Sequence, residues 1–188
     1  MLEDLDSIDW ASLQHAYGNA SDVPVLLRSL LSEEEQVRDN AIYELFGNIH
    51  HQGTIYETSS YAVPFLMEFL DCSNFTKKDD IAVLVICIAG YYNVDVPEKN
   101  KVDATRNESV IICQVRCAAL PYIPQLLPYM QNAELVEACG YEFALMLSRY
   151  PEYFELTIPV LENAVAIQTE YEIEEEMQAI LDHMKKCD

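Results

Sequence analysis

The chain has 188 residues, of which 51% are hydrophobic, so it is long and apolar enough to fold as one domain around its own core. Its 32 Asp and Glu residues outnumber 11 Lys and Arg, which gives a formal net charge of -21 at pH 7. A charge of this sign repels nucleic-acid phosphates and anionic lipids. The composition therefore argues against a nucleic-acid or membrane partner and favours a basic protein partner, although simple solvation explains many single charges equally well.

Residues 1–20 are expected to form an N-terminal cap. They contain an acidic arm and the segment IDWASLQHAYG, which we expect to be a helix with Trp10, Leu13 and Ala16 facing inward and Gly18 ending it. The N-terminus has no basic region followed by an apolar run, and no later stretch has the roughly 18 consecutive apolar residues of a membrane span. These features predict a soluble, cytoplasmic protein.

Two amphipathic helices are predicted between residues 22 and 51. The first has Asp22 as its N-cap and Pro24 in its first turn, where proline is tolerated. The second begins at Ser32, which forms the spacing of a capping box with Glu35, and it weakens at Gly47 before the polar run HHQGT. A single hairpin of this length cannot bury both apolar faces, so further hairpins are expected to stack on it.

A repeated phrase marks these further hairpins. VPVL around Pro24 recurs as VPFL around Pro64, IPQL around Pro124 and IPVL around Pro159, at intervals of 40, 60 and 35 residues. Apart from one insertion, these intervals bracket the period of helical-hairpin repeats. The phrases HAYGNASDVPVLLRSL and GNIHHQGTIYETSSYAVPFLMEFL resemble a bacterial subgroup of small HEAT-repeat proteins over roughly residues 10 to 70. This resemblance implies an α-solenoid that binds proteins, without implying any chemistry.

The remaining hydrophobic pattern predicts helices over 60–71, 76–92, 108–119, 122–131, 132–150, 152–166 and 170–186. The run IAVLVICIAGYY would also suit a buried strand, but its length and its place in the repeat favour a helix. Residues 93–107 are predicted to be an insertion loop. The expected fold is thus all-α: a single domain, 1–188, forming a short α-solenoid of about four HEAT-like hairpins behind the capping helix.

Six cysteines lack the rhythm of a disulfide framework, and we expect reduced thiols in the core. Cys113 and Cys117 are four residues apart and would share one helix face, but two ligands make a weak zinc signal, so burial in the core is favoured over metal binding.

Catalytic signatures are weak throughout the chain. The resemblance to HEAT-like iron hydroxylases fails at its defining residues, because none of His15, His50, His51 or His183 is followed by Glu. The sequence has no nucleophile elbow and no glycine-rich phosphate loop. We therefore expect no catalytic residue, no metal, no cofactor and no small-molecule substrate.

What remains is a binding surface. In solenoids the second helices of the hairpins line a concave face, and helical counting places acidic and tyrosine side chains there. These candidate partner-binding residues are Glu34, Glu35, Tyr43, Glu44, Glu137, Tyr141, Glu142, Tyr171, Glu172 and Glu175.

The sequence thus favours a protein-binding module without enzymatic activity. The sharpest hypothesis is a bacterial immunity protein or antitoxin, which would neutralise a cognate toxin by filling its basic cleft with acidic side chains. A scaffold or assembly adaptor is the first alternative, and a HEAT-like lyase acting on a cofactor-bearing protein is the second.

Overall fold

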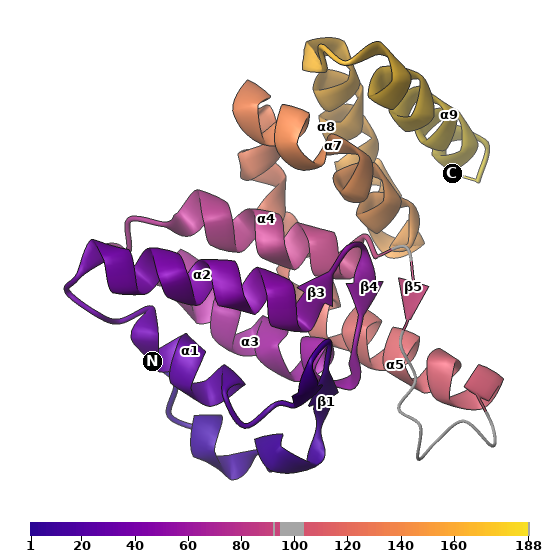
Figure 1. Cartoon of the computed structure of the whole chain (residues 1–188). Coiled ribbons are helices and arrows are strands. Elements are labelled where there is room, and N and C mark those ends of the chain that lie inside the picture. The colour runs from indigo at the N-terminus through magenta and orange to yellow at the C-terminus, as the bar shows by residue number, and fades with distance from the viewer. Residues whose placement is uncertain (92, 95–103, 188) are drawn as a thin grey trace.

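The computed structural model describes residues 1–91, 93–94 and 104–187, and within them the chain is predominantly helical (Figure 1). The predicted all-α class is confirmed. The α-helices are α1 Val23–Ser29, α2 Glu35–Ile49, α3 Glu57–Asp71, α4 Lys78–Ala89, α5 Ala104–Ala119, α6 Ile123–Leu126, α7 Ala133–Ser148, α8 Phe154–Ile167 and α9 Tyr171–Cys187. Short 3-10 turns are η1 Leu5–Ser7, η2 Trp10–Ser12, η4 Leu120–Tyr122, η5 Leu127–Gln131 and η6 Pro151–Tyr153.

The strands are two residues long and serve as connections. β1 Gln14–His15 pairs antiparallel with β2 Gly18–Asn19. β3 His50–His51 pairs antiparallel with β4 Thr54–Ile55, and β4 pairs in parallel with β5 Asn93–Val94. These ladders gather the ends of helices that lie far apart in the sequence.

Helices that follow one another in the chain pack together in several pairs. α1 packs on α2, α3 on α4, and α8 and α9 both contact α7 and each other. The second helices also form a row, because α2 contacts α4, α4 contacts α7, and α7 contacts α9 (Figure 1). This order is compatible with stacked hairpins, and the arrangement of the helices as turns of a solenoid stays a prediction.

α4 lies in the middle of this stack and is helical, as its length and position predicted. Ile81, Leu84, Val85, Ile86 and Ile88 are all fully buried. They belong to one cluster of buried hydrophobic side chains that extends from the N-terminal turns to α9. A helix that is apolar on nearly every side requires neighbours on nearly every side, which α3, α5, α7 and α2 supply.

The predicted N-terminal capping helix is wrong. Trp10 and Leu13 are buried as expected, but they belong to 3-10 turns and an extended segment, where the Trp10 Nε1–H donates to the Leu5 carbonyl at 2.8 Å. Gly18 adopts a φ of +133°, which favours glycine and makes the turn between β1 and β2 instead of ending a helix.

α1 begins directly after the predicted N-cap residue, whereas the predicted start of α2 is wrong. Asp22 precedes α1, but its side chain makes no cap hydrogen bond. Ser32 and Glu35 do not form a capping box, because α2 begins at Glu35 and the Ser32 hydroxyl accepts from the Glu34 N–H. At the start of α3 a serine that we did not single out makes a capping interaction. The Ser59 hydroxyl accepts from the Tyr56 N–H at 2.8 Å and donates to the Ile49 carbonyl at 2.6 Å.

The repeated prolines do not occupy equivalent positions. Pro24 and Pro124 lie in the first turns of α1 and α6, whereas Pro64 and Pro159 lie inside α3 and α8. α3 begins at Glu57, before the predicted start at 60, because the Ser59 hydrogen bonds fix a turn ahead of the proline. The phrase therefore identifies helices without marking their first residues.

The predicted insertion loop overlaps ordered elements. Its first two residues form β5, and α5 already begins at Ala104; residues 95–103 lie outside the described part of the chain. The break predicted in the proline-rich segment is confirmed, since Pro121, Pro124 and Pro128 each lie in the first turn of a new short helix. Val110–Gln131 is a 22-residue stretch that is long and apolar enough to cross a membrane by length and composition alone, and only about a third of its most apolar part is buried. We did not single it out from the sequence.

α7 contains a kink that periodicity did not predict. Cys139 has a non-helical φ of -148° and ψ of 25°. At the kink the buried Gln168 donates from Nε2 to the Val136 carbonyl at 3.0 Å, and its Oε1 accepts from the Thr169 and Glu170 N–H groups. The Gln168 side chain thus provides hydrogen-bond partners for the Val136 carbonyl in α7 and for two N–H groups of the segment that leads into α9.

Candidate protein-binding face

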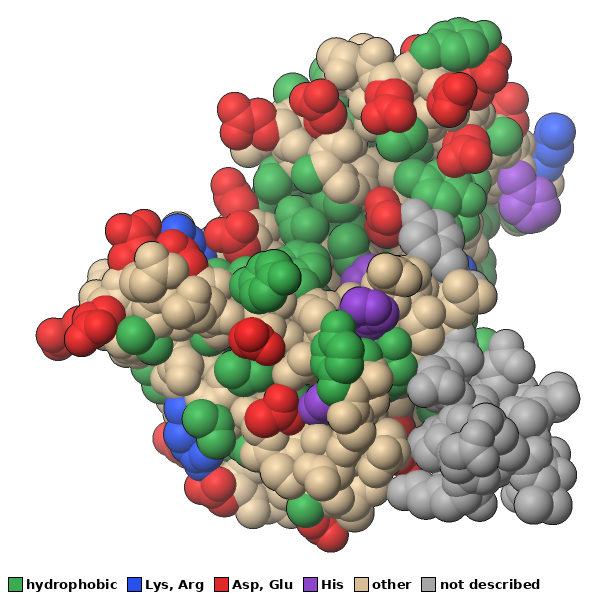
Figure 2. All heavy atoms as spheres, viewed as in Figure 1, with side chains coloured by type: hydrophobic (Ala, Val, Ile, Leu, Met, Phe, Trp, Pro, Cys, Tyr) green, Lys and Arg blue, Asp and Glu red, His purple; other side chains and the backbone are tan. Residues whose placement is uncertain are grey.

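The ten predicted partner-binding residues fall on three helices of the row formed by α2, α4, α7 and α9. Glu34 precedes α2, while Glu35, Tyr43 and Glu44 belong to it. α7 carries Glu137, Tyr141 and Glu142, and α9 carries Tyr171, Glu172 and Glu175. In Figure 2 the surface is indented between α2 and the α8–α9 pair, with acidic side chains on both sides and hydrophobic ones between them.

Exposure divides these candidates into two groups. Tyr43 and Tyr171 are 78% and 67% exposed, and Glu137 is exposed. Tyr141 and Glu142 are half-buried and already interact within the protein. The sequence predicts Glu137 and Glu142, with Tyr141 between them, nearest the middle of the face. Two of these three residues already interact within the protein, and the exposed candidates lie mainly on α2 and α9.

On α9 the structure brings Tyr171 and Glu175 together. The Tyr171 hydroxyl donates to a Glu175 carboxylate oxygen, one helical turn away. This hydrogen bond raises the pKa of Tyr171. The pair presents an exposed aromatic ring beside carboxylates, as helical counting predicted.

A hollow between α2 and α4 contains residues that sequence analysis missed. It is lined by Ile42, Tyr43 and Phe46 together with Asp39, Lys77 and Asp80. The Lys77 ammonium lies 2.8 Å from an Asp39 oxygen and 3.3 Å from a Glu35 oxygen, and these hydrogen bonds raise its pKa. The apolar run of α4 predicts burial, whereas the polar residues KKDD before it indicate that the start of the helix reaches the surface.

The carboxylates of this hollow repel one another. Burial raises the pKa of Asp80, and the neighbouring Asp39 and Asp79 raise it further, against the opposing effect of Lys77. A further cation in the hollow would therefore stabilise the charged form of Asp80.

A second hollow adjoins the first at Tyr43 and Phe46. It is also lined by Tyr17, Glu44 and His51. Tyr17 is 69% exposed, and its hydroxyl lies 3.3 Å from His51 Nδ1. Tyr43 therefore stands between two shallow hollows, each of which combines aromatic and acidic side chains.

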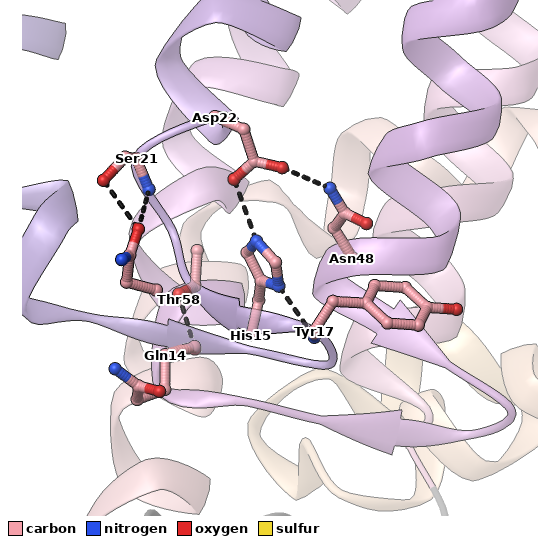
Figure 3. A network of polar contacts seen from close by, with 8 residues as sticks. Gln14, His15, Tyr17, Ser21, Asp22, Asn48 and Thr58 are labelled. Atoms are coloured by element: carbon pink, nitrogen blue, oxygen red, sulfur yellow. Dashed lines mark hydrogen bonds and ion pairs between the residues drawn. The ribbon is translucent and has the colours of Figure 1, made fainter.

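A polar network holds the β1–β2 hairpin, and with it Tyr17, against α2 (Figure 3). The buried His15 accepts the Tyr17 N–H on Nδ1 at 3.0 Å, so in the neutral ring Nε2 carries the proton and donates to Asp22 Oδ1 at 2.8 Å. The other Asp22 oxygen accepts from the Asn48 side chain of α2 at 2.7 Å. Both His15 nitrogens are thus engaged, and the His15–Asp22 pair positions the hairpin instead of activating a nucleophile.

The adjacent histidines differ from this arrangement. Burial, and then the neighbouring His51, lowers the pKa of His50 to about 4, and its Nε2 is buried without a partner among the described residues. Among residues 1–91, 93–94 and 104–187, no three His, Cys, Asp or Glu side chains are grouped so that they could hold a metal ion.

The cysteines only partly follow the predicted burial. Cys87 and Cys139 are in the core, where burial raises the pKa of Cys139 to about 12 and that of Cys87 well above its usual range. Cys113, Cys117 and Cys187 are exposed, and Cys72 is intermediate. The core assignment of Cys113 and Cys117 is wrong because α5 packs with its other side, which carries Ile111 and Val115, against the protein.

Comparison with protein families, curated proteins and solved structures finds no match to this chain. The resemblance to HEAT-repeat proteins therefore stays a prediction from its residues.

Proposed function

We propose that this chain is a protein-binding module without enzymatic activity, whose acidic face on α2, α4, α7 and α9 engages a basic protein. The observation that carries the proposal is the position of Tyr43, which is 78% exposed between two hollows. Exposed aromatic rings surrounded by charge are frequent anchors of protein interfaces. Asp39, Glu44 and Asp80 would favour Lys or Arg on the partner over neutral or acidic residues.

The interaction of Lys77 supports this choice of partner. Its ammonium group is paired with Glu35 and Asp39 in the hollow beside Tyr43. The lining of the hollow contains two carboxylates, Asp39 and Asp80, and one ammonium group, that of Lys77, so acidic side chains outnumber basic ones there. A basic side chain of a partner would bind carboxylate groups in this hollow, as Lys77 does.

A more specific form of the proposal is a bacterial immunity protein or antitoxin. Such a protein would occupy the basic cleft of a cognate toxin with its acidic side chains. The net charge of -21 supports this form, because it speeds association with a basic target through long-range attraction. An adaptor that assembles basic proteins would use the same face.

The test begins with capture of the partner from its native cells, followed by affinity measurement with purified components. We expect Tyr43→Ala and Glu137→Lys to weaken binding by about 2 to 5 kcal/mol, roughly 30-fold to several thousand-fold, mainly through faster dissociation. Glu3→Lys is the control, because Glu3 is exposed and belongs to none of the four helices of the proposed face. Association should slow as salt shortens the Debye length from about 10 Å at 0.1 M to about 3 Å at 1 M.

If Tyr43→Ala and Glu137→Lys bind as tightly as the wild type, the acidic face is not the interface. Co-expression with a toxin encoded beside this chain separates the two forms of the proposal. Protection by the wild type and loss of protection by these variants would support an immunity protein. Binding without protection would favour an adaptor over an immunity protein.

A further inference from the structure

Two arginines converge on one pocket at the side of α5. Arg116 of α5 and Arg149, which follows α7, line a pocket of about 190 Å³ together with Tyr91 and Tyr150. Lys and Arg together number only 11 in a chain with 32 acidic residues, so two arginines in one small pocket are unusual for this protein. The pocket shares no lining residue with the hollows around Tyr43 and does not depend on the proposed function.

Aromatic rings hold both guanidinium groups in place. Arg116 Cζ lies 5.0 Å from the centre of the Tyr150 ring, and Arg149 Cζ lies 4.3 Å from the centre of the Tyr91 ring. Both distances are within the range of about 6 Å for cation–π interaction. A guanidinium group keeps its N–H donors in its own plane and a ring contact uses none of them as hydrogen bonds, so both groups remain able to bind an acceptor.

The hydrogen bonds within the protein do not use all of these donors. Arg116 donates from Nη2 to both carboxylate oxygens of Glu152, at 2.6 and 2.7 Å. Arg149 donates from Nη2 to the Tyr91 carbonyl at 2.8 Å, whereas its Nη1 is buried and has no partner among the described residues. A buried unpaired donor on a charged group is costly. Arg149 Nη1 is therefore able to bind an acceptor that the described residues do not supply.

Charge indicates what that acceptor is. Among the described residues, the two arginines are paired with one carboxylate, that of Glu152, so one positive charge at the pocket is not neutralised by this part of the chain. We propose that the pocket binds a small oxyanion, a carboxylate or a phosphate group, between Arg116 and Arg149. Arginine donors suit such oxyanions because two N–H groups can bind two oxygens at once.

Two further properties fit this ligand. Burial raises the pKa of Tyr150 far above its usual range, so its hydroxyl keeps its proton and can donate. The overall negative charge does not prevent binding, because carboxylates farther away than the Debye length of about 8 Å at physiological ionic strength are screened, while the two guanidinium groups would touch the ion.

The experiment measures thermal stability in increasing sodium phosphate or sodium acetate, with sodium chloride added to hold the ionic strength constant. We expect a saturable rise in melting temperature with at least one of these anions, because a ligand that binds only the folded state stabilises it. In Arg116→Met the apparent affinity should fall at least about tenfold, the effect of losing about 1.4 kcal/mol. Arg28→Met is the control, since it removes an exposed arginine paired with Asp6 and leaves the pocket intact.

A second measurement follows the Nε–H resonances of Arg116 and Arg149 by NMR during the same titrations, with Arg28 as the internal control. A response to phosphate alone would identify a phosphate site, a response to acetate alone a carboxylate site, and a response to both a general oxyanion site. If neither anion shifts these resonances, or if Arg116→Met responds like the wild type, the pocket is not an anion site. The NMR measurement observes Arg149 in the wild-type protein. It therefore does not depend on an Arg149→Met variant, which would lose its hydrogen bond to the Tyr91 carbonyl and could fail to fold.

Discussion

Gly90 shows how closely single residues fix the packing of this molecule. It ends α4 with an ordinary φ of -90°, so its conformation would suit any residue. A Cβ atom added there would lie 2.1 Å from the Glu142 carbonyl oxygen and 2.8 Å from its carbonyl carbon. The backbones of α4 and α7 therefore meet at this position with no space for a side chain.

We predict that Gly90→Ala destabilises the protein by about 1 to 3 kcal/mol or more, because backbone atoms of α7 would have to move. Gly47→Ala is the matched control. Gly47 lies inside α2, where the nearest atom to an added Cβ is Tyr17 Cε2 at 3.8 Å, so alanine should be neutral or stabilising by up to about 1 kcal/mol. Urea denaturation measures both changes, and equal stability of the two variants would contradict the close approach of α4 and α7.

The polar network around His15 could not be predicted from the sequence. Asp22 has the position of an N-cap, and helical signals assign it that role. In the structure its carboxylate binds His15 and Asn48 instead, because the β1–β2 hairpin and the end of α2 lie on either side of it (Figure 3). Local spacing identifies a residue that can cap a helix. It does not show which side chains from distant segments will bind the same carboxylate in the folded protein.

At the scale of the elements, periodicity predicted where helices exist better than where they begin. The apolar run of α4 and the amphipathic pattern of α9 were recognised because each shows a strong local pattern. The N-terminal hairpin was missed because its residues are held by tertiary hydrogen bonds, such as the bond from the Ala16 N–H to the Asn48 carbonyl. The kink in α7 was missed for the same reason, since Gln168 compensates it from the turn between α8 and α9.

The orientation of three helices can be tested through their thiols. We predict that Cys113 and Cys117 of α5 react with a thiol reagent in the native protein, since both are exposed. Cys117 should react more slowly than Cys113, because its hydrogen bond with Cys113 raises its pKa. Cys87 of α4 and Cys139 of α7 should react only after denaturation, because they are buried and their raised pKa values disfavour the reactive thiolate at neutral pH. Peptide mass spectrometry after brief labelling distinguishes the sites, and fast native labelling of Cys87 would mean that α4 is not central.

At the scale of the whole molecule, the sequence predicted the candidate face in part. Helical counting found Tyr43, Glu44 and the α9 residues, because exposure on an amphipathic helix follows from its period. It missed Asp39, Phe46 and Asp80, which become neighbours only when α2 packs against α4. It also did not reveal that the backbone of Glu142 meets Gly90 at the end of α4.

The central claim is that a basic protein binds the row formed by α2, α4, α7 and α9. Hydrogen–deuterium exchange of the complex with its captured partner tests this claim most directly. We predict slower exchange in the exposed turns of α2 around Tyr43, in the first turn of α4 and in α9, with no change in α1 or α8, which flank the row. Protection confined to α1 and α8, with unchanged exchange in α2 and α9, would contradict the claim.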